Sequence, residues 1–294
     1  MKKTIIKTIL PASYPGLLPH IKPLPDHLDM IGTLPPAHYT YLCIVGSRTH
    51  SSYGIETCRH LIQGLKGSPL CIVSGLAIGI DSIAHEAALE TGLPTVAFPG
   101  SGLSASALYP RSRRNLAERI ISSGGALLSP FKYDQCATDW TFPVRNRLMA
   151  GISKATLIIE ARQGSGTLLT ATYATEFSRD VMAVPGSIYS ELSYGPHMLI
   201  KSGAAVITSS QDILRELGFT ATEGTSSSID LDQLGLSDDE RMICSHLVHE
   251  RLTSTDIMER TSLSITRINV ALTGLEMRGL VTQRMGTYGL HISS

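Results

Sequence analysis

Seven short apolar runs recur between residues 41 and 219, and this repeat constrains the fold more than any other feature of the chain. Each run is apolar at consecutive positions and ends near Gly, Ser or Pro, and segments with helical spacing lie between the runs. Strands that are apolar on both faces and alternate with helices are typical of a mostly parallel sheet covered on both sides. We therefore expect a doubly wound α/β domain over residues 41–219. The runs are Leu42–Val45, Leu70–Val73, Thr95–Phe98, Ala126–Leu128, Thr156–Ile159, Val181–Val184 and Ala204–Ile207.

The composition changes on either side of this domain. The first forty residues contain seven prolines, which exclude a long uninterrupted helix, so we expect residues 1–40 to form an irregular Pro-rich arm. Residues 220–228 are small and polar without apolar periodicity, which is typical of a linker. Residues 229–294 carry nine acids and six bases, a net charge of −3, whereas residues 1–228 have a net charge of +3. We therefore predict a separate domain over residues 229–294.

The pattern of residues 229–294 predicts three helices and a hairpin. Ser237-Asp-Asp-Glu240 is a capping box that opens the first helix, Ser254 and Ser264 are candidate caps of the second and third, and Gly279 ends the third. Residues 280–292 follow as a small hairpin, and the whole plan indicates a winged-helix domain. The apolar residues expected to face its core are Met242, Ile243, Leu247, Ile257, Met258, Ile268, Leu272 and Leu275.

The composition excludes several classes of protein. With 43% hydrophobic and 17% charged residues, the chain is too apolar to be disordered. The net charge is zero, so any nucleic-acid site must be local. The five cysteines form no CxxC pair, which argues against a zinc site or a disulfide framework. No apolar run approaches the roughly 20 residues that cross a membrane, and no signal peptide is recognised. We expect a cytoplasmic protein without metal or cofactor.

Glycine-rich loops follow three of the expected strands, where doubly wound sheets bind ligands. Gly46-Ser47-Arg48 follows the first run, Gly75 and Gly79 follow the second, and Gly164-Ser165-Gly166-Thr167 follows the fifth. Backbone N–H groups of such loops and a nearby guanidinium suit phosphate oxygens. A structural turn with a solvated arginine is the alternative explanation. The loops contain neither a Walker A motif nor GxGxxG, so ATP hydrolysis and NAD binding are not indicated.

Asp81 and His85 are four residues apart on one expected helix and therefore face the same side. They fit an acid–base pair or two metal ligands. Alternatively, Asp81 accepts hydrogen bonds from N–H groups of the first helical turn and His85 packs in the core. The absence of a third ligand at a useful spacing favours the structural roles.

Residues 111–147 are locally basic, with seven cations against three acids. Aromatic residues are interleaved with these cations, a pattern that suits single-stranded nucleic acid because cations contact phosphates and rings stack on bases. A solvated helix face and core roles for the rings are the alternative. The candidate phosphate ligands here and beyond are Arg111, Arg145, Asn146, Arg147 and Lys201, and the candidate stacking groups are Trp140 and Phe142.

Six strings of the chain occur in a fixed order and spacing, and together they resemble the DNA-processing protein A (DprA/Smf) family. The resemblance runs from about Tyr14 to the C-terminus. The strings are Gly-Ser-Arg (46–48), Ser-Gly-Leu-Ala-x-Gly-Ile-Asp-x-x-Ala-His (74–85), Tyr-Pro (109–110), Phe-Pro-x-Arg-Asn-Arg (142–147), Gly-Ser-Gly-Thr-Leu-Leu-Thr-Ala (164–171) and Val-Pro-Gly-Ser (184–187).

The resemblance implies an extended Rossmann domain that binds single-stranded DNA, forms a homodimer and has no enzymatic activity. It further implies that the protein protects incoming single strands in natural transformation and helps to load the RecA recombinase. Family members usually have Ser-Glu where this chain has Ser129-Pro130. The residues that match the family's DNA-binding strings are Arg48, Arg145, Arg147, Gly164 to Thr167 and, at a less uniformly basic position, Arg111.

Two other functions are open. The segment 164–171 also resembles the Gly-Gly-x-Gly-Thr-x-x-Glu pattern of nucleotide phosphoribohydrolases of the lysine-decarboxylase-like group. Thr170 stands at the position of that Glu, and a hydroxyl cannot replace the carboxylate. A winged-helix regulator of duplex DNA is the second alternative, although an acidic domain offers few phosphate contacts. The favoured hypothesis is non-catalytic, with N–H groups of Gly46, Gly75 and the 164–167 loop binding successive phosphates beside Arg48 and Arg145.

Overall fold

The computed structural model describes residues 6–219, 235–247, 252–284 and 286–290. The chain divides into two compact units, Met1–Ala221 and Thr222–Ser294, and each is described by itself. The expected linker, residues 220–228, lies outside the described residues.

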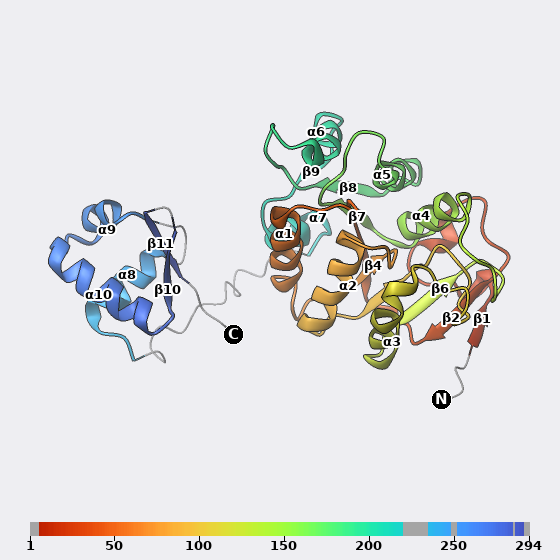
Figure 1. The fold of residues 1–294 in the computed structure, drawn as a ribbon, viewed down its shortest axis with the longest axis horizontal. Coiled ribbons are helices and arrows are strands. Elements are labelled where there is room, and N and C mark those ends of the chain that lie inside the picture. The colour runs from red at the N-terminus through yellow and green to blue at the C-terminus, as the bar shows by residue number, and fades with distance from the viewer. Residues whose placement is uncertain (1–5, 220–234, 248–251, 285, 291–294) are drawn as a thin grey trace. The chain divides into compact units, whose positions relative to one another are not determined.

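The first unit is built on one mixed sheet, and all seven apolar runs are strands of it (Figure 1). Its strand order is β1-β2-β6-β5-β4-β3-β7-β8-β9, and every pair from β6 to β9 is parallel. This arrangement confirms the doubly wound, mostly parallel sheet that the sequence predicts. The strands are β1 (Ile6–Ile9), β2 (Leu28–Gly32), β3 (Thr40–Val45), β4 (Leu70–Ser74), β5 (Thr95–Ala97), β6 (Ala126–Ser129), β7 (Ala155–Ile158), β8 (Asp180–Ala183) and β9 (Ala205–Val206).

Helices cover both faces of this sheet because neighbouring residues of each central strand point to opposite sides. In β3, Leu42 and Ile44 pack with the helices of one face, whereas Cys43 and Val45 pack with those of the other. The first face is covered by α1 (Ser52–Gln63), α2 (Ile80–Thr91), α3 (Arg114–Ser122) and α7 (Ser210–Glu216). The second is covered by α4 (Thr141–Ile152) and α5 (Gly166–Glu176).

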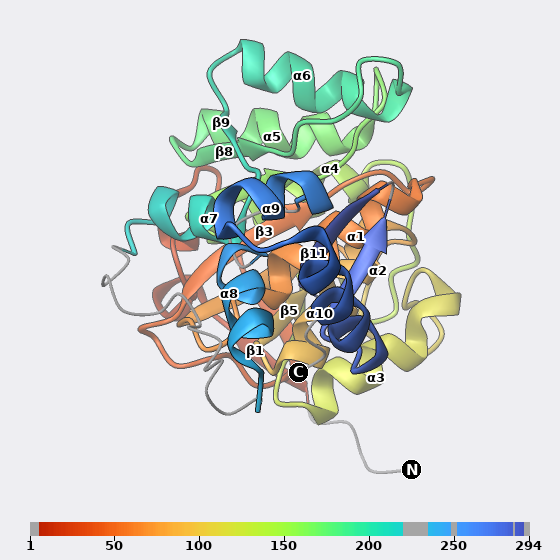
Figure 2. The same cartoon turned by 90° about the vertical axis from the view of Figure 1, so that its left-hand side faces the viewer.

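At the β9 end, α6 (Tyr194–Lys201) packs beside β8, as both views show (Figure 2). This helix directly precedes β9 in the chain.

The expectation of an irregular N-terminal arm is wrong for part of residues 1–40. Strand β1 pairs antiparallel with β2, and β2 pairs antiparallel with β6, so this segment extends the sheet by two strands. The prolines lie outside both strands, because a proline within them would remove a donor of the ladder. The segment Leu28–Gly32 contains no proline and is buried on both faces, with Leu28 and Met30 in one core cluster and Ile31 in another.

In its described residues, the second unit contains three helices and a hairpin, as the sequence predicts for a winged helix. They are α8 (Asp238–Leu247), α9 (Ser254–Thr261), α10 (Ile265–Met277), β10 (Val281–Arg284) and β11 (Thr287–Leu290). Ser237 and Glu240 form the expected capping box of α8.

Two details of the second unit differ from the expectation. The cap of α9 is Thr253, which forms a capping box with Asp256, and not Ser254. Met242 and Met258 are exposed rather than buried. Each is the chain neighbour of a buried residue, and neighbouring residues of a helix point about 100° apart, so the two methionines face away from the core.

Candidate functional site

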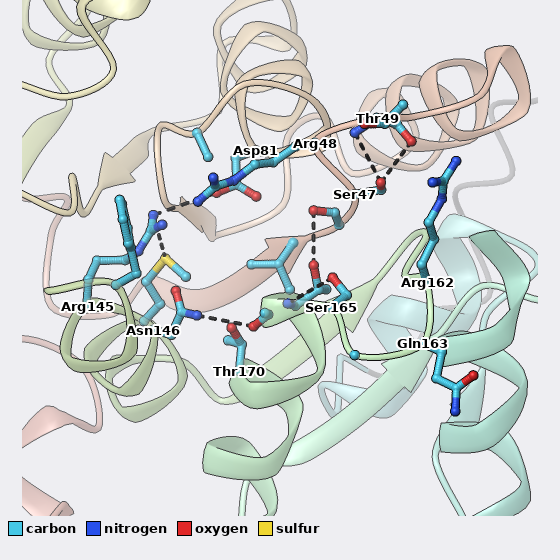
Figure 3. Close-up of a pocket in the computed structure, with 18 residues that line it drawn as sticks. Ser47, Arg48, Thr49, Asp81, Arg145, Asn146, Arg162, Gln163, Ser165 and Thr170 are labelled. Atoms are coloured by element: carbon cyan, nitrogen blue, oxygen red, sulfur yellow. Dashed lines mark hydrogen bonds and ion pairs between the residues drawn. The ribbon is translucent and has the colours of Figure 1, made fainter. Parts of the chain in front are cut away.

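The main pocket of the first unit lies at the point where the strand order reverses. From β3 the chain crosses to β4 on one side, whereas the neighbour on the other side is β7. Loops after two such strands diverge, which opens a crevice at their carboxyl ends. The pocket has a volume of about 460 Å³ (Figure 3). It is lined by Val45–Thr49, Ala77, Asp81, Phe142, Arg145, Asn146, Met149, Arg162–Thr167 and Thr170.

Arg48 stands on the loop between β3 and α1 with an exposed side chain. Its guanidinium lies 5.3 Å from the centre of the Phe142 ring, a cation–π contact that orients it. Tyr109 packs against the same ring, and the centres of the two rings are 5.8 Å apart. Arg48 makes no ion pair with any residue that the structure describes, so its donors are available to an anion.

The N-terminus of α5 forms the opposite wall. The Ser165 hydroxyl accepts a hydrogen bond from the Thr167 N–H at 3.2 Å and caps the helix. Two further hydrogen bonds hold this loop in place: the Thr167 hydroxyl donates to the Gly46 carbonyl at 3.1 Å, and the Asn146 amide donates to the Gly166 carbonyl at 3.2 Å. The N–H groups of Gly164 and Gly166 have no partner among the described residues. Such free N–H groups at the positive end of a helix dipole favour an anion.

A buried ion pair lies at the floor of the pocket. Arg145 is only 4% exposed, and its Nη1 atom is 3.7 Å from Oδ2 of Asp81, which is also buried. The same Nη1 donates to the Phe98 carbonyl at 3.1 Å, and the Gly75 N–H donates to Asp81 at 3.1 Å. A Cβ atom at position 75 would overlap the Arg145 guanidinium, so a larger residue there would displace Arg145 from its present position.

Burial is the dominant influence on the protonation of this pair. It raises the pKa of Asp81, and the nearby Arg145, the N–H groups of Ala77 and Gly75, and Arg48 offset only part of that rise. Burial likewise lowers the pKa of Arg145, but an arginine stays protonated at any pH that proteins tolerate. The pocket therefore holds a permanent cation beside a carboxyl group that is easier to protonate than usual.

The glycines of the 75–79 loop do not line this pocket, but Gly75 lines an adjoining pocket of about 40 Å³ together with Arg48 and Arg145. The Gly75 N–H is bound to Asp81 and cannot also bind a phosphate. Gly79 has a φ of +91°, and a Cβ atom there would overlap the Ser47 carbonyl and the Arg48 backbone. The Gly75 N–H is therefore not the free donor that the sequence predicts, and Gly79 allows the close approach of the two loops.

Asp81 and His85 have separate partners. The ring of His85 is fully buried and its Nδ1 atom lies 2.7 Å from the Thr95 hydroxyl, whereas Asp81 binds Arg145 and Gly75. Burial lowers the pKa of His85 to about 3, so the ring is neutral. The structural explanation therefore holds for His85, and within the described residues no group of three His, Cys, Asp or Glu side chains could hold a metal ion.

Three predicted cations lie outside this pocket. Arg147 is on α4 with Arg145, but two residues turn about 200° around a helix, so it points away. It donates to the Pro23 carbonyl and lies 5.8 Å from the centre of the Phe177 ring. Arg111 is exposed in the short helix before α3. Lys201 lines a different pocket of about 300 Å³ beside α6.

The two candidate stacking residues differ in position. Phe142 lines the pocket under Arg48. Trp140 lies outside it with its side chain 57% exposed, and it makes an edge-on contact with Phe131 at 5.6 Å. A core role for Trp140 is thereby excluded.

Sequence reasoning missed Arg162 and Gln163, which line the pocket just after β7. In Figure 3, Arg48 and Asp81 lie beside Arg145 at one end of the pocket, and Arg162 lies at the other end. Arg162 is exposed, and its one acidic neighbour in the described chain is Glu191, 3.9 Å away. Its position was a usable signal, because Arg162 follows a strand end as Arg48 does, but it stands beside the glycine-rich segment 164–167, which by itself suggested the binding loop. In the described parts of the chain, no helix has the length and apolar character needed to cross a membrane.

Fold and site together define a class: a doubly wound α/β protein with an arginine-lined pocket at the reversal of its strand order, followed in the chain by a winged-helix unit. Residues 5–218 match the family model of the DNA recombination-mediator protein A, and residues 230–287 match that of the DprA winged helix domain. The chain belongs to this DprA/Smf family, as its sequence strings predict.

Relatives from several bacteria support this membership. Protein Smf of Escherichia coli (strain K12) is 36% identical over 282 residues, which cover 94% of this chain and 74% of that protein. The DNA processing protein DprA of Streptococcus pneumoniae is 40% identical over 212 residues, or 72% of this chain and 74% of that one.

Two solved structures resemble the first unit closely. The X-ray structure of DNA processing protein A from Streptococcus pneumoniae aligns with a TM-score of 0.67 and 38% identity, and covers 73% of this chain and 75% of that one. DNA processing protein A from Helicobacter pylori, whose structure was described for its single-stranded DNA binding mode, aligns with a TM-score of 0.64 and 25% identity over 73% of this chain and 96% of that one.

Proposed function

We propose that the chain binds single-stranded DNA through its phosphate backbone and does not cleave it. The observation that carries this proposal is the convergence of three arginines (Arg48, Arg145 and Arg162) and the free N–H groups at the start of α5 on one pocket. Arginines and helix N-termini both favour phosphate oxygens. Because backbone contacts carry little sequence information, weak sequence preference and strong salt dependence follow.

The aromatic residues favour a single strand over a duplex. Phe142 lies inside the pocket under Arg48, and Tyr109 packs beside it. Bases of a single strand can be turned toward such rings, whereas bases of a duplex are already stacked and paired. The single-stranded DNA binding described for the related Helicobacter pylori protein supports the same assignment.

The pocket offers little to a hydrolytic mechanism. Asp81 is the one carboxylate among the residues that line it, and this carboxylate is tied to Arg145 and Gly75. Thr170 lines the pocket at the position that holds the catalytic Glu in the phosphoribohydrolase pattern. A glycosidic cleavage that needs a free carboxylate therefore lacks its central group.

Family membership extends the proposal to the cell. The chain would protect incoming single strands in the cytoplasm during natural transformation and help to load the RecA recombinase, acting as a homodimer. These roles rest on the family, whereas the DNA-binding site rests on the pocket.

Fluorescence anisotropy with labelled oligo(dT) and a duplex of the same length, each at two salt concentrations, tests the proposal. We expect tighter binding of the single strand. Arg48→Ala should make the plot of log K against log salt shallower by about 0.7, the value for one phosphate contact of a single strand.

Arg215→Ala is the matched control, because this exposed arginine lies on α7 outside the pocket. For this variant, the slope of log K against log salt should equal that of wild type. Equal affinity for the duplex, or identical slopes for both variants, would contradict the site. Release of free base from nucleoside monophosphates, abolished by Arg48→Ala, would contradict the non-catalytic assignment.

A further inference from the structure

Asp81 is an anion at the floor of a pocket otherwise built to attract anions. It lines the same 460 Å³ pocket as Arg48 and Arg145, and its Oδ2 atom is 3.7 Å from Nη1 of Arg145. A phosphate that binds in this pocket competes with the Asp81 carboxylate for the same guanidinium groups. The two anions also repel each other across a partly desolvated space, where charges interact more strongly than in water.

The surroundings of Asp81 contain few charges that could relieve this repulsion. Arg145 faces it from α4 and Arg48 from the loop after β3, while the N–H groups of Gly75 and Ala77 bind it from the loop before α2. The other titratable groups that sense its charge are the buried thiols of Cys43 on β3 and Cys58 on α1. Burial raises the pKa of both thiols, so they stay neutral at physiological pH.

His85 lies one turn further along α2 but adds no charge. Its ring is buried against Thr95 and its pKa is lowered to about 3. The charged groups that interact in the pocket are therefore two arginines, one carboxylate and the incoming phosphate.

We propose that Asp81 takes up one proton when a phosphate of single-stranded DNA binds in the pocket, so that DNA binding is coupled to pH. This inference rests on the proposed function. The proton comes from solvent and forms an O–H bond on the carboxylate, and no other bond changes. The group then changes from a competing acceptor into a donor that can bind a phosphate oxygen, while Arg145 is freed to face the DNA.

The existing environment already favours the protonated form. Burial raises the pKa of Asp81 above its ordinary value before any ligand arrives. A bound phosphate raises it further, so the carboxyl group has a higher pKa in the complex than in the free protein. By linkage, the affinity for DNA increases as the pH falls from the pKa of the complex toward that of the free protein, by up to tenfold per pH unit.

Oligo(dT) binding measured from pH 5.5 to 8.5 at constant ionic strength tests the coupling, because thymine does not titrate in this range. Wild type should bind progressively more weakly as the pH rises. Asp81→Asn, which mimics the protonated group, should lose that dependence and bind at pH 8.5 at least as tightly as wild type does. Asp212→Asn is the matched control, since this carboxylate lies on α7 outside the pocket and the pKa of Asp212 is lowered by its hydrogen bonds to Thr208 and Ser209.

Titrating groups elsewhere in the chain would affect all three proteins alike, so only the difference between variants counts. Equal pH profiles for Asp81→Asn and wild type would overturn the inference. If Asp81→Asn does not fold, carbon-13 NMR of wild type with labelled aspartate carboxyl groups decides. On addition of oligo(dT) at constant pH, the Asp81 signal should move toward its protonated position, and a stationary signal in a saturated complex would overturn the coupling. Absence of binding at every pH would instead refute the proposed function itself.

Discussion

Arginines in two regions of this chain differ in what they can bind. In the pocket of the first unit, Arg48 has no carboxylate within ion-pair distance among the described residues, and Arg162 has only a distant one. On α10, the helix that reads DNA in many winged-helix proteins, Arg267 donates two hydrogen bonds to Asp239. The same residue type is thus an available phosphate ligand in one region and is neutralised in the other.

The exposed residues of α10 strengthen this contrast. Val270 is 71% exposed and Met277 is 85% exposed, so part of the outward surface of α10 is apolar. Helices that bind duplex DNA depend on available cations for most of their affinity. The two regions thus differ in how available their arginines are to a polyanion, and we expect this availability, more than the number of arginines, to decide where single-stranded DNA binds.

We expect the largest effect for Arg145→Ala, which should lower the free energy of unfolding. Loss of the guanidinium leaves the Asp81 carboxylate buried and unpaired, which costs about 3–5 kcal/mol. Without Arg145 the pKa of Asp81 in the folded state rises further above its unfolded value, so the loss should be greater at pH 8 than at pH 5. Urea denaturation at the two pH values measures it.

The control for that experiment is Arg267→Ala in the second unit, which removes a partner of an exposed pair and should change stability little. A comparable loss in both variants, or a loss from Arg145→Ala that does not depend on pH, would break the distinction between the buried and the exposed pair.

We expect the next largest effect for Arg162→Ala, which should lower the affinity for oligo(dT). This arginine lines the pocket at the opposite end from Arg145, and its removal should weaken oligo(dT) binding by about 1–2 kcal/mol, or roughly 5- to 30-fold. Anisotropy titration gives the value. Arg267→Ala should bind like wild type, and a matching loss from that variant would show that α10 takes part in binding.

A smaller effect is expected for the helix cap of α5. Ser165→Ala removes the acceptor of the Thr167 N–H and should cost about 1 kcal/mol in the free energy of unfolding. Ser264 stands at the corresponding position of α10 but makes no side-chain capping hydrogen bond, so Ser264→Ala should change stability by less than about 0.5 kcal/mol. Equal losses would mean that the cap of α5 is not stabilising.

The smallest effect is expected from the largest deletion. Removal of residues 229–294 should leave the oligo(dT) affinity of the first unit within about twofold, because the pocket is built entirely from that unit. The same anisotropy titration applies. A collapse of affinity would place essential phosphate ligands in the second unit and reverse the comparison.

Much of the fold was predictable because it follows from local patterns. Four-residue apolar runs between amphipathic segments predict parallel strands, and all seven became strands. Strands β1 and β2 were missed, because prolines on both sides suggested irregular structure and the pairing of β2 with β6 is a long-range contact.

The site was predictable only in part. The rule that ligands gather at strand ends brought Arg48 and the 164–167 loop together correctly in one pocket. It did not separate Arg145 from Arg147, although helix geometry alone turns residues two apart to nearly opposite sides. It also gave Gly75 a free N–H, which the tertiary structure uses to hold Asp81.

Residue types and spacings along the chain were enough to predict the alternating strands and helices of residues 41–219, the family, and the loops at the carboxyl ends of the strands. Which charges are available follows only from how distant parts of the chain meet in space. Whether an arginine meets a carboxylate, a carbonyl or open solvent depends on residues distant in sequence, as Asp81 with Arg145 and Asp239 with Arg267 demonstrate. Coulomb energy depends on distance and burial in space, and neither is written in the local pattern.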